Sequence, residues 1–254
     1  MIEWIVQDIF GDETEDLLRA LTNQGIKYYL VKENQHFSYN QQYIIRGSLE
    51  FVNEQQKENI NLLYFHLKNF NCSRYYHRFK NLMFNNDHFF VTKAGLKLSK
   101  NILPWSQIPP TQRVFIRPDS GGKEFTGTYI CKKWFEKDID IVLKNTSMLD
   151  SDLILVSTYK DSVEEFRGVV LNGKLISVSK ESFNGVKISS KFYKQILEFA
   201  KSFVFPNISF CYTVDFCEVD GKIRIVEANS FNCAGLYNVN YDKIVKEISN
   251  VFIS

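Results

Sequence analysis

The sequence lacks the features of several protein classes. Its five cysteines are odd in number and form no CxxC pair, so neither a disulfide framework nor a cysteine-based zinc site is expected. The four histidines are dispersed, without HxH or HxxxH spacing, which argues against a histidine-based metal site. We therefore expect reduced, mostly buried thiols and no zinc.

An excess of charge of one sign is also missing, as are long apolar runs. Lys and Arg number 31 against 29 Asp and Glu, a net charge of +2, and the basic residues are scattered, so a nucleic-acid partner is not expected. No stretch approaches the roughly 18 apolar residues of a membrane span. The N-terminal MIEWIVQDIFGDETED carries acids where a signal peptide needs basic residues. We expect a cytoplasmic protein without a membrane partner.

What is present is the composition of a folded protein. A chain of 254 residues with 44% hydrophobic residues can bury a substantial core. Residues 1–107 show alternating strand and helix patterns, as in a small α/β lobe. Three of the five prolines follow in residues 101–110, which suits a linker. Residues 108–254 are richer in strands, with amphipathic helices starting at Ser190 and Tyr241, so we predict an α+β domain there.

The segment CYTVDFCEVDGKIRIVEANS, residues 211–230, predicts a β-hairpin. We expect a three-residue loop at residues 219–221, where a glycine suits the left-handed closing position. Because strand side chains alternate, that loop places Asp215, Glu227 and Asn229 on one face, whereas a two-residue loop would separate Asp215 from the other two. Two carboxylates and an amide oxygen suit Mg²⁺. A solvent-facing polar strand edge is the alternative.

The segment VFIRPDSGGKEFTG, residues 114–127, combines two cations with a glycine turn. Arg117 lies at the end of a predicted strand, and Lys123 follows a turn of Ser and two Gly at residues 120–122. Such a turn lets backbone N–H groups approach an anion. The segment lacks the Walker spacing GxxxxGK[ST], and a plain surface turn explains it as well.

A third segment, residues 153–179, begins with an apolar strand and a polar connector. Glu165 and Arg167 follow and share a face of the next strand by period-two alternation. Asn172 and Gly173 then mark a tight hairpin turn. An ion pair on a solvated strand is the alternative interpretation of the Glu-x-Arg pair.

Taken in chain order, these segments resemble the ATP-grasp superfamily, in particular the phage and bacterial clade named for two arginines and one lysine. Arg117, Lys123 and Arg167 match that trio, and EANSFNCAGLY matches the terminal Glu-x-Asn-x-x-x-x-x-Gly-x-Tyr signature. The likeness extends to RGSLEF from Arg46 and FNCSRYYHRFKNLMFNND from Phe70. The resemblance covers most of the chain.

The resemblance implies an α+β ATP-grasp fold, in which two α+β subdomains enclose the nucleotide, preceded by the α/β lobe of residues 1–107. It implies that adenine lies against a connector strand at Ser157, Thr158 and Tyr159. Glu165 would accept hydrogen bonds from the ribose hydroxyls.

The same resemblance implies roles for the cations and the acids. Arg117 and Lys123 would hold phosphates, and Arg167 would steady the γ-phosphate or a developing acyl phosphate. The remaining implied ligands are Asp215, Glu227 and Asn229 for two Mg²⁺ ions, with Glu227 bridging, and Asn232 as a further phosphate or substrate contact.

The activity implied is that of a carboxylate–amine ligase. ATP converts a carboxylate to an acyl phosphate, and an amine then displaces phosphate to form an amide. The partners are ATP, an unidentified carboxylate and an unidentified amine, either of them part of a small molecule, a peptide or a modified macromolecule. A small-molecule kinase on the same fold and a non-catalytic nucleotide-binding module are the alternatives, and retention of the implied metal ligands argues against the module.

Overall fold

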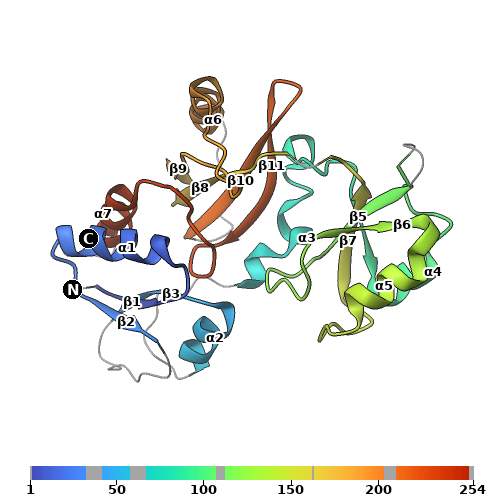
Figure 1. The fold of residues 1–254 in the computed structure, drawn as a ribbon, viewed down its shortest axis with the longest axis horizontal. Helices are drawn as coiled ribbons and strands as arrows, with labels where there is room; N and C mark the ends of the chain where they lie inside the picture. The colour runs from blue at the N-terminus through green and yellow to red at the C-terminus, as the bar shows by residue number, and fades with distance from the viewer. Residues whose placement is uncertain are drawn as a thin grey trace. The chain divides into compact units, whose positions relative to one another are not determined.

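The structure is a computed structural model that describes residues 2–32, 42–57, 67–106, 112–161, 163–202 and 210–251. The chain divides into a larger unit, Met1–His66 with Glu164–Ser254, and a smaller unit, Leu67–Val163. The chain thus leaves the larger unit once and returns to it (Figure 1). The sequence-predicted domains, 1–107 and 108–254, follow the proline-rich segment instead. They concern which residues carry the chemistry of the family, and they stay a prediction.

The larger unit begins with a three-stranded parallel sheet. Its order is β2-β1-β3, and β1 pairs in parallel with both neighbours. The α/β pattern expected for the N-terminal part is therefore present. Four of the five β1 residues are buried, as expected for a central parallel strand covered on both faces. The elements are β1 (Glu3–Gln7), α1 (Asp12–Asn23), β2 (Tyr28–Val31), β3 (Tyr43–Arg46) and α2 (Leu49–Lys57).

The second sheet of the larger unit is antiparallel, in the order β11-β10-β8-β9. Asn172 and Gly173 join β8 to β9 with φ angles of 49° and 75°, so the predicted tight turn is confirmed. The elements are β8 (Phe166–Leu171), β9 (Lys174–Val178), α6 (Ser190–Ser202), β10 (Cys211–Val219), β11 (Lys222–Ser230) and α7 (Tyr241–Val251).

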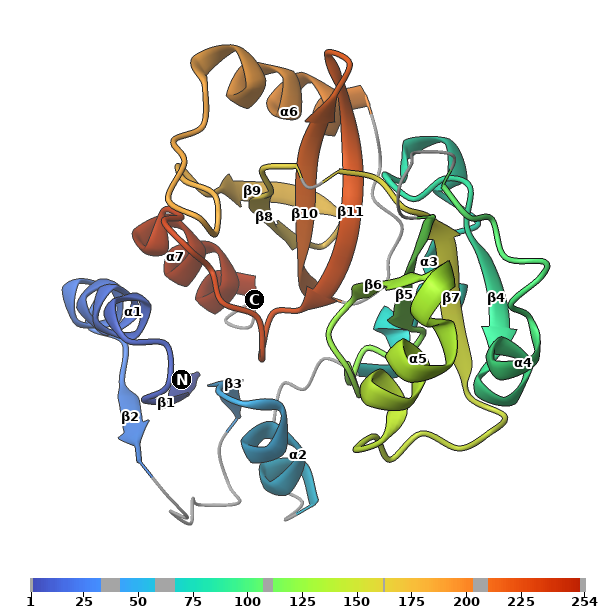
Figure 2. The same ribbon diagram turned by 45° about the vertical axis from the view of Figure 1, so that its right-hand side comes forward.

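One hydrophobic core joins both sheets of the larger unit. Trp4 of β1, Leu21 of α1, Val169 of β8 and Ile244 of α7 belong to the same buried cluster. Figures 1 and 2 show α7 beside α1, and α7 buries residues at helical spacing, which confirms the amphipathic helix predicted from Tyr241. The N-terminal and C-terminal parts of the chain therefore fold as one body.

The smaller unit contains a four-stranded antiparallel sheet, in the order β4-β7-β5-β6 (Figure 2). Residues of α4 and α5 pack with residues of β5 and β7 in one core cluster, which covers one face of the sheet. Its elements are η1 (Leu67–Phe70), α3 (Cys72–Tyr75), η2 (Lys80–Leu82), β4 (Phe89–Thr92), α4 (Lys93–Leu98), β5 (Arg113–Pro118), β6 (Thr128–Cys131), η3 (Lys132–Trp134), α5 (Phe135–Leu143) and β7 (Leu153–Thr158).

The β10–β11 hairpin corrects the predicted loop. Val219 pairs with Lys222, so the loop has two residues, Asp220 and Gly221, with φ angles of 51° and 71°. Positive φ at both positions identifies a type I′ turn, whose twist matches the strands. The expected three-residue loop is wrong, because the sequence alone did not show that Asp220 adopts the left-handed conformation.

A β-bulge restores the arrangement that the shorter loop would have broken. The register shifts between Asp215 and Phe216, and Val226 of β11 is the extra residue of the bulge. Beyond the bulge, Asp215 lies opposite Glu227, and two positions along the strand Asn229 is paired in the same register. Directly opposed residues share a face of a sheet, so the predicted common face of Asp215, Glu227 and Asn229 is confirmed.

Two further expectations are answered by the described residues. None of the five cysteines, all of which are described, forms a disulfide, as expected for reduced thiols. Within the described ranges no helix is long and apolar enough to cross a membrane. The helix predicted from Asn53 is present only as part of α2, and the rest of that prediction, residues 58–66, lies outside the described residues.

The type I′ turn generates a test. Gly221→Ala should lower the free energy of unfolding by about 1 kcal/mol, because an L side chain disfavours positive φ. No atom lies within 4 Å of the added Cβ, so the loss would report backbone conformation alone. Urea denaturation measures the loss, with Asp220→Asn as a neutral control because Asn tolerates the left-handed region. Equal stability of the Gly221→Ala protein and the wild type would contradict the assigned turn.

Candidate active site

A row of polar side chains crosses the antiparallel sheet of the larger unit. Asp215 of β10 lies opposite Arg167 of β8 on one side and opposite Glu227 of β11 on the other. We call Arg167, Asp215, Glu227 and Asn229 the polar row. Val169, two residues along β8 on the same face, already belongs to the buried core, so the row lies where this face passes from core to polar residues.

Arg167 and Asp215 form a buried bidentate ion pair. Nε of Arg167 donates to Oδ1 of Asp215 at 2.7 Å, and Nη2 donates to Oδ2 at 2.6 Å. The two side chains are only 7% and 2% exposed. Parallel hydrogen bonds of this kind are among the strongest in proteins. The pair fixes the guanidinium plane beside the acids of the polar row.

Two further groups hold the same guanidinium. Its Nη1 donates to the backbone oxygen of Gly235 at 2.7 Å, and the ring of Tyr237 lies 4.5 Å from Cζ. Burial would lower the pKa of Arg167, but the charge and hydrogen bonds of Asp215 raise it above its ordinary value. Arg167 is therefore cationic at all relevant pH values.

Tyr237 lies within the electrostatic field of the polar row. Burial raises its pKa to about 12; Arg167 lowers it, while Asp215, Glu227 and Glu165 raise it. The phenol is therefore neutral at pH 7. The same interactions show that Glu165 is electrostatically coupled to the same tyrosine as Arg167, although Glu165 precedes the first residue of β8.

The donor atoms of the polar row suit a hard divalent cation. Asp215 and Glu227 supply carboxylate oxygens, and Asn229 supplies an amide that donates from Nδ2 to Oε1 of Glu227 at 2.7 Å. The carboxylate oxygens of Asp215 retain lone pairs beyond the two bonds from Arg167. Among the described residues no group of three His, Cys, Asp or Glu forms a metal cluster, so the set depends on the asparagine. Its chemistry fits Mg²⁺.

Asn232 is placed differently from the other predicted ligands. Its side chain is fully buried, Nδ2 donates to the backbone oxygen of Ile45 at 2.8 Å, and Oδ1 accepts from Ser230 at 3.1 Å. Its backbone oxygen accepts from Gly47 at 2.9 Å. These contacts join the end of β3 to the turn after β11. The phosphate or substrate contact expected of Asn232 stays a prediction.

In the smaller unit, Arg117 and Ser157 lie on the same face of the sheet. Arg117 pairs with Leu155, and Phe115 pairs with Ser157, so all four share one face by alternation. The opposite face carries the core residues that pack against α4 and α5. A Cβ on Gly127 would lie 2.8 Å from the Phe115 ring and 3.5 Å from Cβ of Arg117, so the chain after the glycine turn runs close to this face.

The glycine turn itself is tied down within the smaller unit. The amide of Gly121 donates to Oδ1 of Asn71 at 3.3 Å, and the amide of Gly122 donates to Oγ of Ser120 at 2.9 Å. A Cβ on Gly121 would lie 2.6 Å from the backbone oxygen of Leu67, so only glycine fits there. The sequence predicted that these amides approach an anion; in this structure both have acceptors inside the chain. Lys123 follows with an exposed side chain and a φ of 52°.

The end of the predicted connector strand is held by an upstream acid. The amide of Thr158 donates to Oδ2 of Asp87 at 3.0 Å, and Lys160 forms an ion pair with the same carboxylate. Burial would raise the pKa of Asp87, but the bonds from Lys160 and Thr158 lower it below its ordinary value. The Tyr159 ring contacts Tyr129 edge to face at 5.5 Å. The backbone of the connector is thus positioned before any ligand binds.

Sequence reasoning missed groups that hold the site together. Tyr237 belongs to the quoted terminal signature, and Asp87 closes the quoted segment from Phe70, but neither was given a role. Nothing in the local sequence pattern indicates that Asp87 meets a strand 71 residues later. These contacts depend on tertiary structure.

The comparison of sequence families decides the identity. The second ATP-grasp domain family of the clade named for two arginines and one lysine matches residues 99–246, more than half of the chain. The chain belongs to this family. The resemblance inferred from the motifs is thereby confirmed, while the likenesses quoted from Arg46 and Phe70 lie outside the matched residues. A search of curated protein sequences finds no match.

Solved structures confirm the α+β ATP-grasp fold. The D-cycloserine synthetase DcsG matches with a TM-score of 0.68 at 11% identity, over 99% of both chains. The D-alanine–D-alanine ligase from Helicobacter pylori matches with a TM-score of 0.61 at 12% identity, over 100% of this chain and 99% of that one. The ATP-grasp ligase PsnB, solved with a precursor peptide and AMPPNP, has a TM-score of 0.51 at 12% identity, over 98% and 96%.

The buried pair of this ATP-grasp enzyme generates a stability prediction. Asp215→Asn should lower the free energy of unfolding by about 3 kcal/mol, because it leaves the guanidinium of Arg167 buried without its counter-charge. The control is Glu198→Gln, which breaks an exposed pair with Lys201 and should cost less than about 0.5 kcal/mol. Urea denaturation measures both. Similar losses for the two variants would contradict the importance of the buried pair.

Proposed function

We propose that this ATP-grasp enzyme is an ATP- and Mg²⁺-dependent carboxylate–amine ligase that forms an amide or peptide bond through an acyl phosphate. The observation that carries the proposal is the polar row. The register of β8, β10 and β11 brings Arg167, Asp215, Glu227 and Asn229 together on one face, at the positions of the family signature. This combination of one cation with oxygen donors suits a metal-bound triphosphate.

In this proposal the larger unit holds the metal. Asp215, Glu227 and Asn229 ligate two Mg²⁺ ions, with Glu227 bridging them. The ions supply charge neutralisation for the phosphates of ATP. Glu165 accepts hydrogen bonds from the ribose hydroxyls, and the location of Glu165 near Tyr237 and the polar row supports that role.

The smaller unit supplies two cations and a strand for the nucleotide. Arg117 and Lys123 contact phosphate oxygens, and the backbone and side chains of residues 157–159 lie against the adenine. The shared sheet face of Arg117 and Ser157 supports this assignment. A nearly buried arginine is suited to bidentate contact with phosphate oxygens, and an exposed lysine acts as a mobile point charge.

The reaction proceeds in two displacements. A carboxylate oxygen of the substrate attacks the γ-phosphorus, the bond to the β–γ bridging oxygen breaks, and ADP leaves. The amine nitrogen then attacks the acyl carbon, the carbon–oxygen bond to phosphate breaks, and the amine loses a proton. Phosphorylation is needed because a free carboxylate offers only an oxide as leaving group. Arg167 stabilises the charge on the transferring phosphoryl group, which is mainly electrostatic catalysis.

The neighbours suggest the range of substrates without naming those of this chain. By their names, one neighbour makes D-cycloserine, one joins D-alanine to D-alanine, and PsnB was solved with a precursor peptide. We infer a small-molecule or peptide carboxylate and a small-molecule or peptide amine, with neither a nucleic acid nor a membrane as partner.

Product analysis tests the proposal. The protein is incubated with ATP, Mg²⁺, a panel of amino acids and peptides, and hydroxylamine, which traps an acyl phosphate as a hydroxamate. Hydroxamate and ADP in equal amounts are expected. Phosphorylated product without hydroxamate would instead assign a kinase, and ATP binding without turnover would assign a nucleotide-binding module.

The metal assignment predicts the effect of one substitution. Glu227→Gln should lower turnover by on the order of 100-fold and raise the Mg²⁺ concentration needed for half-maximal rate, because it removes the bridging carboxylate. Glu218→Gln is the matched control, since Glu218 is an exposed acid on the same hairpin. Turnover is measured as ADP release over a Mg²⁺ titration. Equal Mg²⁺ dependence of the two variants would contradict the assignment.

The phosphate assignment predicts a binding effect in the smaller unit. Lys123→Gln should weaken ATP affinity by about tenfold, because it removes a charge-assisted contact. Lys97→Gln in α4 of the same unit removes an exposed lysine without such a role. Titration with a non-hydrolysable ATP analogue measures both. Matching affinities would exclude Lys123 from the phosphate site.

A further inference from the structure

A turn after β11, residues 231–237, is held by an acid near the start of the chain. Glu13, in the first turn of α1, accepts from the amide of Leu236 at Oε2, 2.6 Å, and from the amide of Tyr237 at Oε1, 2.9 Å. A single carboxylate thus receives two successive backbone N–H groups. Charge-assisted bonds of this kind are stronger than bonds between neutral groups.

A buried arginine holds the other half of the same turn. Arg46, 2% exposed, donates through Nη1 to the backbone oxygen of Phe231 and through Nη2 to that of Ala234 at 2.6 Å. Burial lowers the pKa of Arg46 to about 10, so it remains cationic at pH 7. The turn is therefore fixed by one cation on its carbonyls and one anion on its amides.

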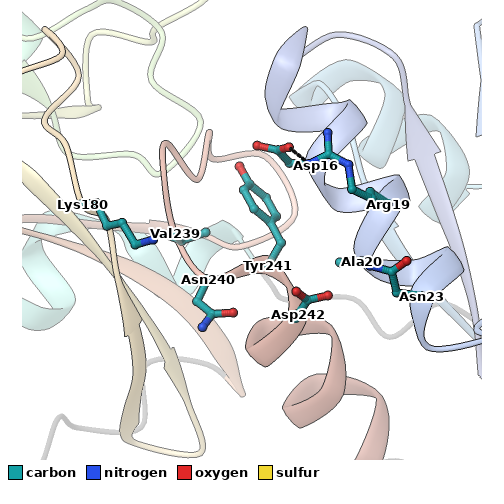
Figure 3. A pocket seen from close by; sticks show the side chains of 9 residues that line it. All are labelled: Asp16, Arg19, Ala20, Asn23, Lys180, Val239, Asn240, Tyr241 and Asp242. Carbon is teal, nitrogen blue, oxygen red and sulfur yellow. Dashed lines mark ion pairs between the residues drawn. The ribbon is translucent and has the colours of Figure 1, made fainter.

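The backbone of Tyr237 needs such support. Its φ of 56° is in the left-handed region, which is unfavourable for an aromatic residue unless its surroundings hold it. Its backbone oxygen accepts from the hydroxyl of Tyr241 at 2.8 Å. Tyr241 in turn lines a pocket of about 320 Å³ between side chains of α1 and the start of α7 (Figure 3). Glu13 and Tyr241 thus hold Tyr237 from its two backbone sides.

This turn is also what holds Arg167 on the side away from Asp215. The backbone oxygen of Gly235 accepts from Nη1 of Arg167 at 2.7 Å, and the Tyr237 ring lies against the guanidinium. Both groups lie within two residues of the amides that Glu13 accepts. A change in the turn would therefore move two of the three contacts that orient Arg167.

We propose that Glu13 is a positioning residue for Arg167: it holds the turn at residues 235–237 in the conformation that orients the guanidinium. The proposal rests on the proposed function only for its effect on turnover, because the orientation itself is a property of the free protein. Glu13 touches no substrate in this account; it acts through the turn.

The fold should survive loss of the Glu13 carboxylate. Phe231 and Leu236, at either end of the turn, are fully buried members of the main core of the larger unit. Arg46 also keeps its bonds to the turn. The turn is therefore expected to loosen locally around Tyr237 without global unfolding, which makes Glu13→Gln a usable variant. Glu15→Gln, at an exposed acid on the same helix, is the matched control.

The first measurement does not depend on catalysis. The Nε–H resonance of Arg167, assigned by its loss in Arg167→Lys, is followed by ¹H–¹⁵N NMR, and hydrogen exchange is followed for the peptide covering residues 231–240. In Glu13→Gln we expect exchange in this peptide to accelerate at least tenfold and the Arg167 resonance to shift or broaden. In Glu15→Gln both should match the wild type.

The second measurement is kinetic. Glu13→Gln should lower kcat by tenfold or more while the KM for ATP changes less than threefold, because a misplaced guanidinium affects the transferring phosphoryl group more than nucleotide binding. The rate is compared at a temperature where unfolding curves show all variants fully folded, so that a loss of stability cannot imitate the effect.

The outcomes separate this inference from the proposed function. An unchanged Arg167 resonance in Glu13→Gln overturns the positioning role, whether or not the turn exchanges faster. A shifted resonance with wild-type kcat shows that Glu13 orients Arg167 without consequence for turnover, which also overturns it. A wild-type protein that forms neither hydroxamate nor ADP refutes the ligase proposal alone, and the NMR result then stands by itself.

Discussion

The buried pair of Arg167 and Asp215 is the interaction on which the rest of the site depends. Removing two charges from water costs several kcal/mol per ion, and the bidentate geometry offsets this cost only when both groups are held in register. The pairing of β8 with β10 supplies that register, and the bond to Gly235 satisfies a further guanidinium donor. A pair of this kind stabilises one arrangement of the strands and presents Glu227 and Asn229 beside a fixed cation.

The turn at residues 231–237 links this pair to the N-terminal part of the chain. Glu13 and Arg46 contact its amides and carbonyls, and Asn232 bonds to the end of β3. The N-terminal sheet therefore does more than add a lobe to the fold. It fixes the segment that carries the last residues of the family signature, which explains why the larger unit combines residues from both ends of the chain.

Much of the fold was predictable because its signals are local. The Asn172–Gly173 turn, the helices from Ser190 and Tyr241 and the strands of the 211–230 hairpin follow from turn chemistry and periodicity over a few residues. The common face of the acids was predicted through a loop of the wrong length. It is present because the bulge at Val226 compensates for the shorter turn, and a bulge leaves no reliable mark in a single sequence.

The sequence by itself determined the family, the candidate ligands and their order along the chain, because motif residues at fixed spacing report the chemistry of a site directly. Only the tertiary structure decided that Asp215 is bound to Arg167, that Asn232 is buried and that Glu13 holds the turn at Tyr237. These contacts join residues up to 224 positions apart. They depend on packing and strand register over the whole larger unit, which local sequence patterns do not encode.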